Sequence, residues 1–221
     1  MKPLMGGGLE DLRLRGGIRI AFATPILEQL RPEAARVNPR LARLILARRS
    51  RDPGLRVSNV GGWHSRPDLL SWPGPEIALV KRWIQEAMAA LLDLAGPGAP
   101  RAGEATLSTE AWANVHRRGG YARSHVHPFN HWSGVYYVRV GRPDGRHPES
   151  GAISFADPRP GAAALPAPGF PFGDEHVIRP RPGLLLVFPS WLAHSVAPVR
   201  GAGERISVAF NVTVRRGGGG R

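Results

Sequence analysis

The apolar residues of this chain follow two different spacings, one before and one after about residue 100. Between Glu76 and Leu94 they recur every three or four positions, which is the spacing of one face of an α-helix. This stripe consists of Ile77, Val80, Trp83, Ile84, Ala87, Met88, Leu91 and Leu92. Gly96-Pro97-Gly98 predicts the end of the helix. A second helix is predicted over 37–49, with arginines on its outer face and Asp52-Pro53-Gly54 after it.

From about Thr106 onward the pattern changes to short, β-prone runs. After one short strand expected at 19–22, strands are predicted over 111–116, 133–140, 151–155, 183–188 and 206–214. Arg118-Gly119-Gly120 and Asp144-Gly145 are turn signals. Helices followed by many short strands favour a mainly β protein with flanking α-helices. The expected architecture is a double-stranded β-helix, that is, a jelly-roll, cupin-like barrel with an N-terminal helical layer.

The composition along the chain indicates one domain with loose ends. Residues 1–17 are rich in glycine and are expected to be flexible, and 215–221 are expected to form a disordered basic tail. The domain spans 18–214, with the helical layer to about residue 100 and the barrel from about residue 106. Residues 159–174 are rich in Pro, Gly and Ala, so they are expected to form a long loop. That loop is either a lid over a site or a plain surface excursion.

Cysteine is absent, which excludes disulfides, thiolate metal sites and cysteine nucleophiles. No apolar run reaches the roughly 18 residues of a membrane span, and the first eight residues lack a signal-peptide core, so a cytoplasmic protein is expected. The formal charge is +13, which is typical of proteins with an anionic partner such as nucleic acid or an acidic peptide. Because the arginines are scattered, a solvated basic surface is favoured over a nucleic-acid site.

Three histidines have the arrangement of metal ligands. His125 and His127 stand at i and i+2, and on a strand they would point to one face with Cα atoms roughly 6–7 Å apart. His194 follows an apolar strand and the turn at Pro189-Ser190, and could complete a set of three. Three protein ligands leave coordination positions open, which is typical of catalytic rather than structural metal sites.

Two further pairs could hold an anion beside that metal. Arg205 and Ser207 face one side of a predicted strand, and a guanidinium fork suits a carboxylate. An arginine facing into a barrel is costly without an anion, so a dicarboxylate cosubstrate is one interpretation and a salt bridge at the barrel rim is the other. Asn114 and His116 also share a strand face and could reach a carboxylate or keto group.

The order of these residues along the chain, Asn114 and His116, then His125 and His127, then His194, then Arg205 and Ser207, resembles that of the double-stranded β-helix oxygenases that use Fe(II) and 2-oxoglutarate. The sequence resembles one bacterial family of 2OG-Fe(II) oxygenases more closely. The resemblance runs from about residue 20 to residue 213. It is carried by Gly61-Gly62-Trp63-His64-Ser65, Trp112-Ala113-Asn114-Val115, His125-Val126-His127-Pro128, Ser133-Gly134-Val135-Tyr136-Tyr137-Val138, Phe155-Ala156-Asp157-Pro158-Arg159, Phe188-Pro189-Ser190-Trp191-Leu192-Ala193-His194 and Arg205-Ile206-Ser207-Val208-Ala209-Phe210-Asn211.

The resemblance implies an Fe(II)- and 2-oxoglutarate-dependent dioxygenase that hydroxylates an unactivated C–H bond, with O2 consumed and succinate and CO2 released. It implies that Fe(II) is held by His125, His127 and His194. The 2-oxoglutarate would bind Arg205 and Ser207, and Asn114 would assist. No catalytic residue is expected beyond the metal ligands. The expected substrate is a small amino-acid-like metabolite, a peptide or a protein side chain, with an acidic one favoured by the charge, and a homodimer is plausible.

The candidates for the substrate pocket are His64, Tyr137, Trp191 and Asp157. His64 follows the Gly-Gly-Trp segment and is expected near the entrance. Tyr137 and Trp191 could line the pocket, or could be plain core residues.

His127 departs from the superfamily, which usually has His-x-Asp/Glu followed by a distant histidine. His127 occupies the carboxylate position. Three interpretations stay open. His127 is a true third ligand, or it lies outside the coordination sphere, or Asp157 supplies an oxygen ligand in its place.

Two other functions compete with the 2-oxoglutarate-dependent enzyme. One is a cupin-like three-histidine dioxygenase that needs no 2-oxoglutarate, although Arg205 would then lack its anion. The other is a non-catalytic metal-binding or nucleic-acid-binding module, which the charge of +13 favours.

Overall fold

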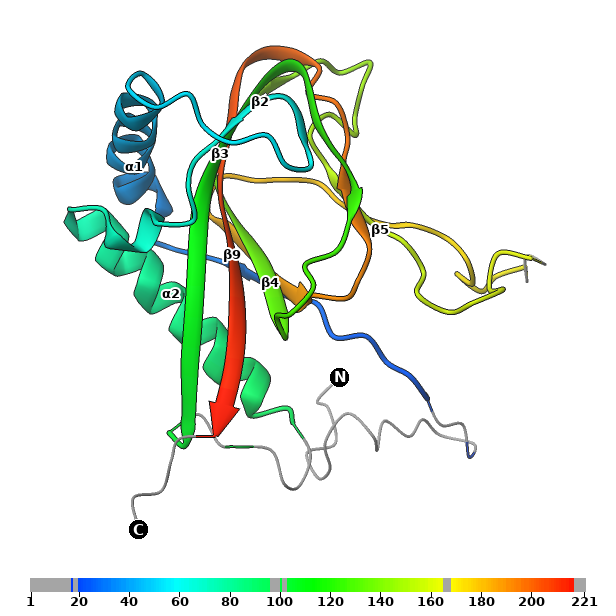
Figure 1. The fold of residues 1–221 in the computed structure, drawn as a ribbon. Helices are drawn as coiled ribbons and strands as arrows, with labels where there is room; N and C mark the ends of the chain where they lie inside the picture. The colour runs from blue at the N-terminus through cyan, green and yellow to red at the C-terminus, as the bar shows by residue number, and fades with distance from the viewer. Residues whose placement is uncertain (1–16, 18–19, 96–99, 101–102, 165–167, 217–221) are drawn as a thin grey trace.

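The computed structural model describes residues 17, 20–95, 100, 103–164 and 168–216. It shows a curled antiparallel sheet with two helices packed on one outer side (Figure 1). The elements are β1 (Leu27–Leu30), α1 (Ala34–Arg49), β2 (Asn59–His64), the 3-10 helix η3 (Leu69–Ser71), α2 (Pro75–Leu92), β3 (Ala105–His125), β4 (Trp132–Pro143), β5 (Ile153–Phe155), β6 (His176–Ile178), β7 (Leu184–Pro189), β8 (His194–Val196) and β9 (Gly201–Arg216). The mainly β jelly-roll architecture with an N-terminal helical layer is confirmed.

The sheet is built around three long strands. Its order is β1-β7-β4-β9-β3-β8-β5-β6, and β2 pairs with β3 outside this path. β9 lies between β3 and β4, and its register with β3 runs from Ala105 opposite Arg216 to His116 opposite Arg205. Beyond this stretch β3 bends away and its last residue pairs with the first of β8 (Figure 1). One continuous strand therefore contributes to both ends of the barrel.

Alternate residues of β3 and β9 face opposite sides of the sheet, as the pleat of a strand requires. One set packs with the buried stripe of α2 in a single core cluster: Ala111, Ala113, Val115, Ile206, Val208, Phe210 and Val212. The other set faces the barrel interior: Glu110, Trp112, Asn114, His116, Arg205, Ser207, Ala209 and Asn211. The helices thus cover one face of the sheet, and the other face is left for a site.

Several boundaries differ from those expected. The described residues at 20–22 form no strand, and the first strand is β1 instead. The segment around Gly119 is a bulge inside β3 rather than a turn, because the register with β2 shifts there and Gly119 has φ +85°. β9 continues to Arg216, two residues into the segment expected to be a tail. The expected flexible segment at 1–16 and the tail at 217–221 lie outside the described residues.

Neither of the two α-helices in the described part of the chain is long and apolar enough to cross a membrane.

Glu204 ties α1 to the sheet. Its carboxylate lies 2.8 Å from Arg49 of α1, 3.0 Å from Arg117 of β3 and 3.9 Å from Arg139 of β4. Burial raises the pKa of Glu204, but the hydrogen bonds and charges of Arg49 and Arg117 together hold it below its ordinary value. Since one carboxylate serves three cations, Glu204→Gln is expected to lower the free energy of unfolding by about 1–2 kcal/mol, measured by urea denaturation.

Asp144→Asn is the matched control, because Asp144 pairs with the exposed Arg146 at the surface. Its unfolding midpoint should stay that of the unmodified protein. Equal unfolding free energies for Glu204→Gln and the unmodified protein would show that the three-arginine cluster contributes nothing to stability.

Candidate metal centre

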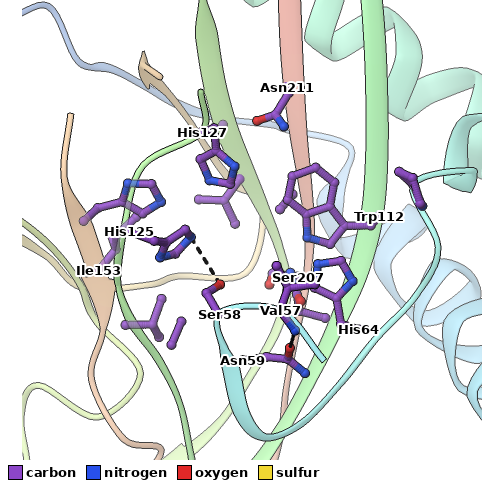
Figure 2. Close-up of a pocket in the computed structure, with 18 of the residues that line it drawn as sticks. Val57, Ser58, Asn59, His64, Trp112, His125, His127, Ile153, Ser207 and Asn211 are labelled. Carbon is purple, nitrogen blue, oxygen red and sulfur yellow. Dashed lines mark hydrogen bonds between the residues drawn. The ribbon is translucent and has the colours of Figure 1, made fainter. Parts of the chain in front are cut away.

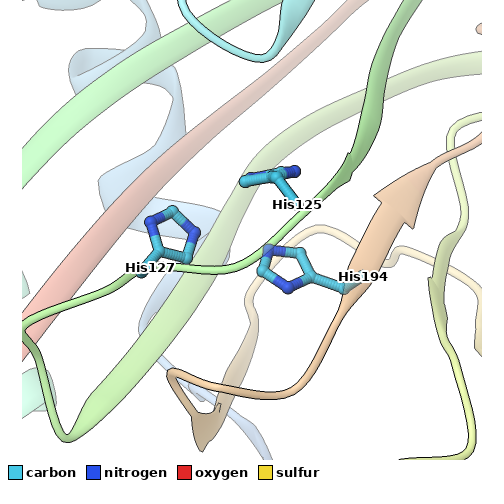
Figure 3. Close-up of side chains that lie close together, drawn as sticks. All are labelled: His125, His127 and His194. Atoms are coloured by element: carbon cyan, nitrogen blue, oxygen red, sulfur yellow. The ribbon is translucent and has the colours of Figure 1, made fainter.

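Three imidazoles meet at the end of the barrel where β3 and β8 pair. His125 is the last residue of β3 and lies directly opposite His194, the first residue of β8. One ligand atom from each of His125, His127 and His194 lies within 4.8 Å of the other two, the only such group of three among the described residues. Figure 3 shows the three rings gathered around one point. The arrangement predicted from the spacing of these histidines is therefore present.

His127 reaches this point from a loop rather than from the strand. β3 ends at His125, so the expectation that both histidines share one strand is wrong. The His127 amide donates a hydrogen bond to the carbonyl of Ser190, at 2.9 Å. This bond ties the loop that carries His127 to the loop that leads into β8. The backbone therefore positions the third histidine without help from strand geometry.

Two of the rings are oriented by backbone carbonyls. Nδ1 of His125 lies 2.7 Å from the oxygen of Arg123, and Nδ1 of His194 lies 2.9 Å from the oxygen of Leu192. A carbonyl only accepts, so both Nδ1 atoms must carry the proton. The lone pair is then on Nε2 in each ring, as in histidines whose other nitrogen is fixed by an outer hydrogen bond. Ser58 Oγ lies 3.4 Å from Nε2 of His125 (Figure 2).

The environment keeps the three imidazoles neutral. Burial lowers the pKa of His127 to about 4, and the pKa of His194 to about 3, with repulsion from neighbouring histidines adding to the effect. Burial also lowers the pKa of His125. Since a metal binds the deprotonated imidazole, the site is ready for a metal ion at neutral pH.

Arg205 lies in the same cavity, whose volume is about 600 Å³, together with the three histidines. Only 3% of Arg205 is exposed. Its Nε donates to the carbonyl of Gly151 and its Nη1 to Ser207 Oγ, both at 3.1 Å, and its guanidinium lies over the ring of Tyr137. No carboxylate of the described residues forms an ion pair with it. Burial lowers the pKa of Arg205, and a buried cation of this kind fits an anionic ligand with a carboxylate.

The remaining residues of this anion site come from the neighbouring strand. Asn114 lies opposite Ser207, and His116 lies opposite Arg205. All four line the cavity, so the sequence-predicted pairs do come together beside the three histidines.

The structure places the predicted substrate residues in different surroundings. His64 lines the cavity, and its ring stacks on that of Trp112 with centroids 5.3 Å apart (Figure 2). Tyr137 is completely buried behind Arg205, and Trp191 is 56% exposed; neither lines the cavity. The Asp157 carboxylate binds Arg159 and the amide of Gly173, at the base of the loop expected at 159–174. Asp157 lines a different cavity from the three histidines and forms no ligand cluster with them.

Sequence reasoning missed the polar residues at the other end of the cavity. Asn211 is buried and accepts a hydrogen bond from Ser133 Oγ, while its Nδ2 donates to Glu110 Oε1, both at 2.8 Å. These three residues lie directly opposite one another on β3, β9 and β4. The signal that could have found Glu110 is the alternation itself. Counting back by twos from His116 and Asn114 leads through Trp112 to Glu110.

Comparison with known proteins agrees with this geometry. Residues 110–211 match a family model described as "Putative 2OG-Fe(II) oxygenase". A prolyl-4-hydroxylase from Pseudomonas putida is similar in structure, with a TM-score of 0.61 and 17% identity over 87% of this chain and 94% of that one.

Two further solved structures share the fold. A prolyl hydroxylase from Trichoplax adhaerens, in complex with a hypoxia inducible factor peptide fragment, has a TM-score of 0.55 and 12% identity over 85% of this chain and 83% of that one. HygX from Streptomyces hygroscopicus, with nickel, 2-oxoglutarate and hygromycin B bound, has a TM-score of 0.56 and 14% identity over 86% and 83%. No curated protein matches the sequence.

Proposed function

Because residues 110–211 match a model of the 2OG-Fe(II) oxygenase family, we propose that the chain is a member of this family and hydroxylates an unactivated C–H bond of a peptide, a protein side chain or an amino-acid-like metabolite. Members of this family are enzymes that use Fe(II), 2-oxoglutarate and O2. The observation that carries the proposal is the buried Arg205, which forms no ion pair with a carboxylate of the described residues and shares one cavity with the three histidines.

The chain offers a separate set of residues for each component. His125, His127 and His194 would hold Fe(II), and Arg205 with Ser207 would hold the far carboxylate of 2-oxoglutarate, with Asn114 beside them. When bound, Fe(II) supplies the oxidation in which O2 and 2-oxoglutarate give succinate and CO2 and one oxygen atom enters the substrate C–H bond. Arg205 and His194 are buried, whereas His125 and His127 are partly exposed to the cavity.

His127 is favoured as the third ligand over Asp157. The Asp157 carboxylate already binds Arg159 and the Gly173 amide, and it belongs to no cluster with the histidines. A three-histidine dioxygenase that needs no 2-oxoglutarate would leave the Arg205 cation without an anion, and a non-catalytic module would have no use for the cosubstrate residues. Both alternatives are therefore disfavoured.

The substrate is proposed to enter at the Glu110 end of the cavity. Two residues along a strand span roughly 7 Å, so the inner face of β3 presents Glu110, Trp112, Asn114 and His116 as successive rows. The Trp112 ring lies beside that of His127, with centroids 5.7 Å apart, so the three histidines lie between the Glu110 row and the Arg205 row.

Glu110 is the one carboxylate among the described residues that line the cavity. Its Oε1 is held by Asn211 and accepts hydrogen bonds, which suits the N–H groups of a peptide or the ammonium group of an amino-acid-like substrate. This favours a donor group near the reacting C–H bond. The acidic partner and the cytoplasmic location expected from the sequence stay predictions.

The test of this function is succinate formation. The protein is loaded with Fe(II) without oxygen, given 2-oxoglutarate and a panel of amino acids and short peptides, and then exposed to air. We expect Fe(II)-dependent succinate, with a rate that rises at least several-fold with a true substrate and with an equal amount of product 16 Da heavier by mass spectrometry. The metal-free protein is the control, and no Fe(II)-dependent succinate with any candidate would contradict the proposed function.

A further inference from the structure

We propose that His116 is a second binding residue for the cosubstrate, whose imidazole N–H donates a hydrogen bond to the far carboxylate of 2-oxoglutarate beside Arg205. This inference rests on the proposed function and deepens it, because it assigns to His116 the selection of dicarboxylate 2-oxo acids over 2-oxo acids with an apolar tail.

His116 is a buried polar residue without a hydrogen-bond partner. Only 2% of it is exposed, and neither Nδ1 nor Nε2 makes a hydrogen bond of ordinary geometry within the described residues, although the backbone of Tyr121 lies close enough to raise the pKa of the ring. Buried polar groups are nearly always hydrogen-bonded, because an unpaired one costs the free energy of its lost hydration. A ring with both nitrogens unpaired, on the wall of a cavity, therefore points to a ligand as the missing partner.

The sheet places this ring next to the Arg205 cation. Gly62 of β2, His116 of β3 and Arg205 of β9 lie directly opposite one another in a single row. The ring lies over Gly62, where a Cβ atom would come within 2.5 Å of its Cδ2 and 2.8 Å of its Nε2. Glycine at this position therefore leaves room for the imidazole. A carboxylate bound to Arg205 would have a second donor within the same row.

The charge state of His116 fits a donor role. Burial lowers its pKa to about 4, and the positive charge of Arg205 adds to the effect. At neutral pH the ring therefore carries one N–H donor and no charge. Arg205 then neutralises the carboxylate, and His116 adds a directional hydrogen bond without a second positive charge in a buried site. Such a pair can bind both oxygens of one carboxylate.

A purely structural role of His116 makes a different prediction for cosubstrate binding. If His116 only fills space, replacing it with phenylalanine removes an unpaired polar ring, and the ligand-free protein should be at least as heat-stable as the unmodified one, with no effect on 2-oxoglutarate. If His116 binds the cosubstrate, the same replacement should keep the melting temperature of the ligand-free protein and weaken cosubstrate binding.

The test is calorimetric titration of 2-oxoglutarate into protein loaded with Mn(II), which fills the metal site without turnover. We expect His116→Phe to weaken 2-oxoglutarate binding by about 10- to 100-fold, the effect of a hydrogen bond to a charged group. Binding of 2-oxovalerate, which has the same length but no far carboxylate, should stay within about 2-fold. His116→Gln, which keeps an N–H donor, should recover part of the affinity, and His147→Phe, in an exposed turn after β4, should change nothing.

Gly62→Ala gives a second route if His116→Phe does not fold, because the added methyl group displaces the ring while the histidine is retained. It should weaken binding of 2-oxoglutarate more than that of 2-oxovalerate. Equal 2-oxoglutarate affinities for His116→Phe and the unmodified protein, or equal losses with both 2-oxo acids, would overturn the assignment of His116 and leave the proposed function standing. Failure of the unmodified protein to bind 2-oxoglutarate would instead overturn the proposed function.

Discussion

Arg205→Ala is expected to weaken 2-oxoglutarate binding by about 2–5 kcal/mol, or roughly 30- to 5,000-fold in Kd, and to remove most succinate formation at ordinary cosubstrate concentrations. Arg205 is 3% exposed and is the one arginine or lysine among the described residues that line the cavity, so its removal would leave the bound carboxylate buried without a counter-charge. The measurement is titration of the Mn(II)-loaded protein, paired with the KM for 2-oxoglutarate in the succinate assay.

Arg205→Lys is the matched control. It keeps the charge but loses the planar fork that bonds Gly151 and Ser207 at the same time, so an intermediate affinity is expected. The metal affinity of both variants should match that of the unmodified protein, because the candidate ligands are His125, His127 and His194, and Arg205 is not among them. Unchanged 2-oxoglutarate binding in Arg205→Ala would show that the cosubstrate carboxylate binds elsewhere.

His127→Ala is expected to weaken metal binding by more than roughly 100-fold. Loss of a residue outside the coordination shell typically lowers the metal affinity 10- to 100-fold, so loss of a direct ligand should lower it further. Anaerobic titration with Fe(II), or with Ni(II) as a redox-stable substitute, measures the effect. His127→Asp, which supplies the carboxylate usual in the superfamily, should recover part of the affinity.

Asp157→Ala serves as the comparison, because Asp157 binds Arg159 and the Gly173 amide away from the metal cluster. Its metal affinity should equal that of the unmodified protein. Survival of metal binding in His127→Ala together with its loss in Asp157→Ala would make Asp157 the third ligand and His127 a neighbour.

The sequence predicted well what depends on local spacing. The stripe from Ile77 to Leu91 is buried against the sheet as the helical period requires, and the alternation along 111–116 assigns Asn114 and His116 to the inner face. The histidine spacing, read with the family resemblance, located the cluster of three histidines. The first two signals lie within a few residues of the positions they predict, whereas His194 stands far along the chain from His127 and was linked to it by the resemblance.

The features that the sequence did not predict depend on pairing between segments far apart in the chain. Local residue spacing gives no information on which segments pair. β1 and β8 have only four and three residues, and each exists because a partner strand far along the chain supplies its hydrogen bonds. The surroundings of Tyr137 also depend on a distant segment. Its place on an apolar strand was clear, but only the register of β4 with β9 shows that Ser207 lies opposite it, with Arg205 stacked on its ring. The end of β3 at His125 is likewise fixed by β8.

The two-sided use of β9 limits how such an enzyme can acquire a new substrate. Between Arg205 and Asn211, every second residue holds the helices and the others face the ligands, so inserting or deleting one residue would exchange the two sets. Such a change would remove the apolar side chains from the core and the polar side chains from the cavity at the same time. New specificity is therefore expected to arise in segments outside this strand, such as Leu55, Val57, Ser58 and Asn59, which line the cavity and do not belong to the core cluster that contains α1 and α2.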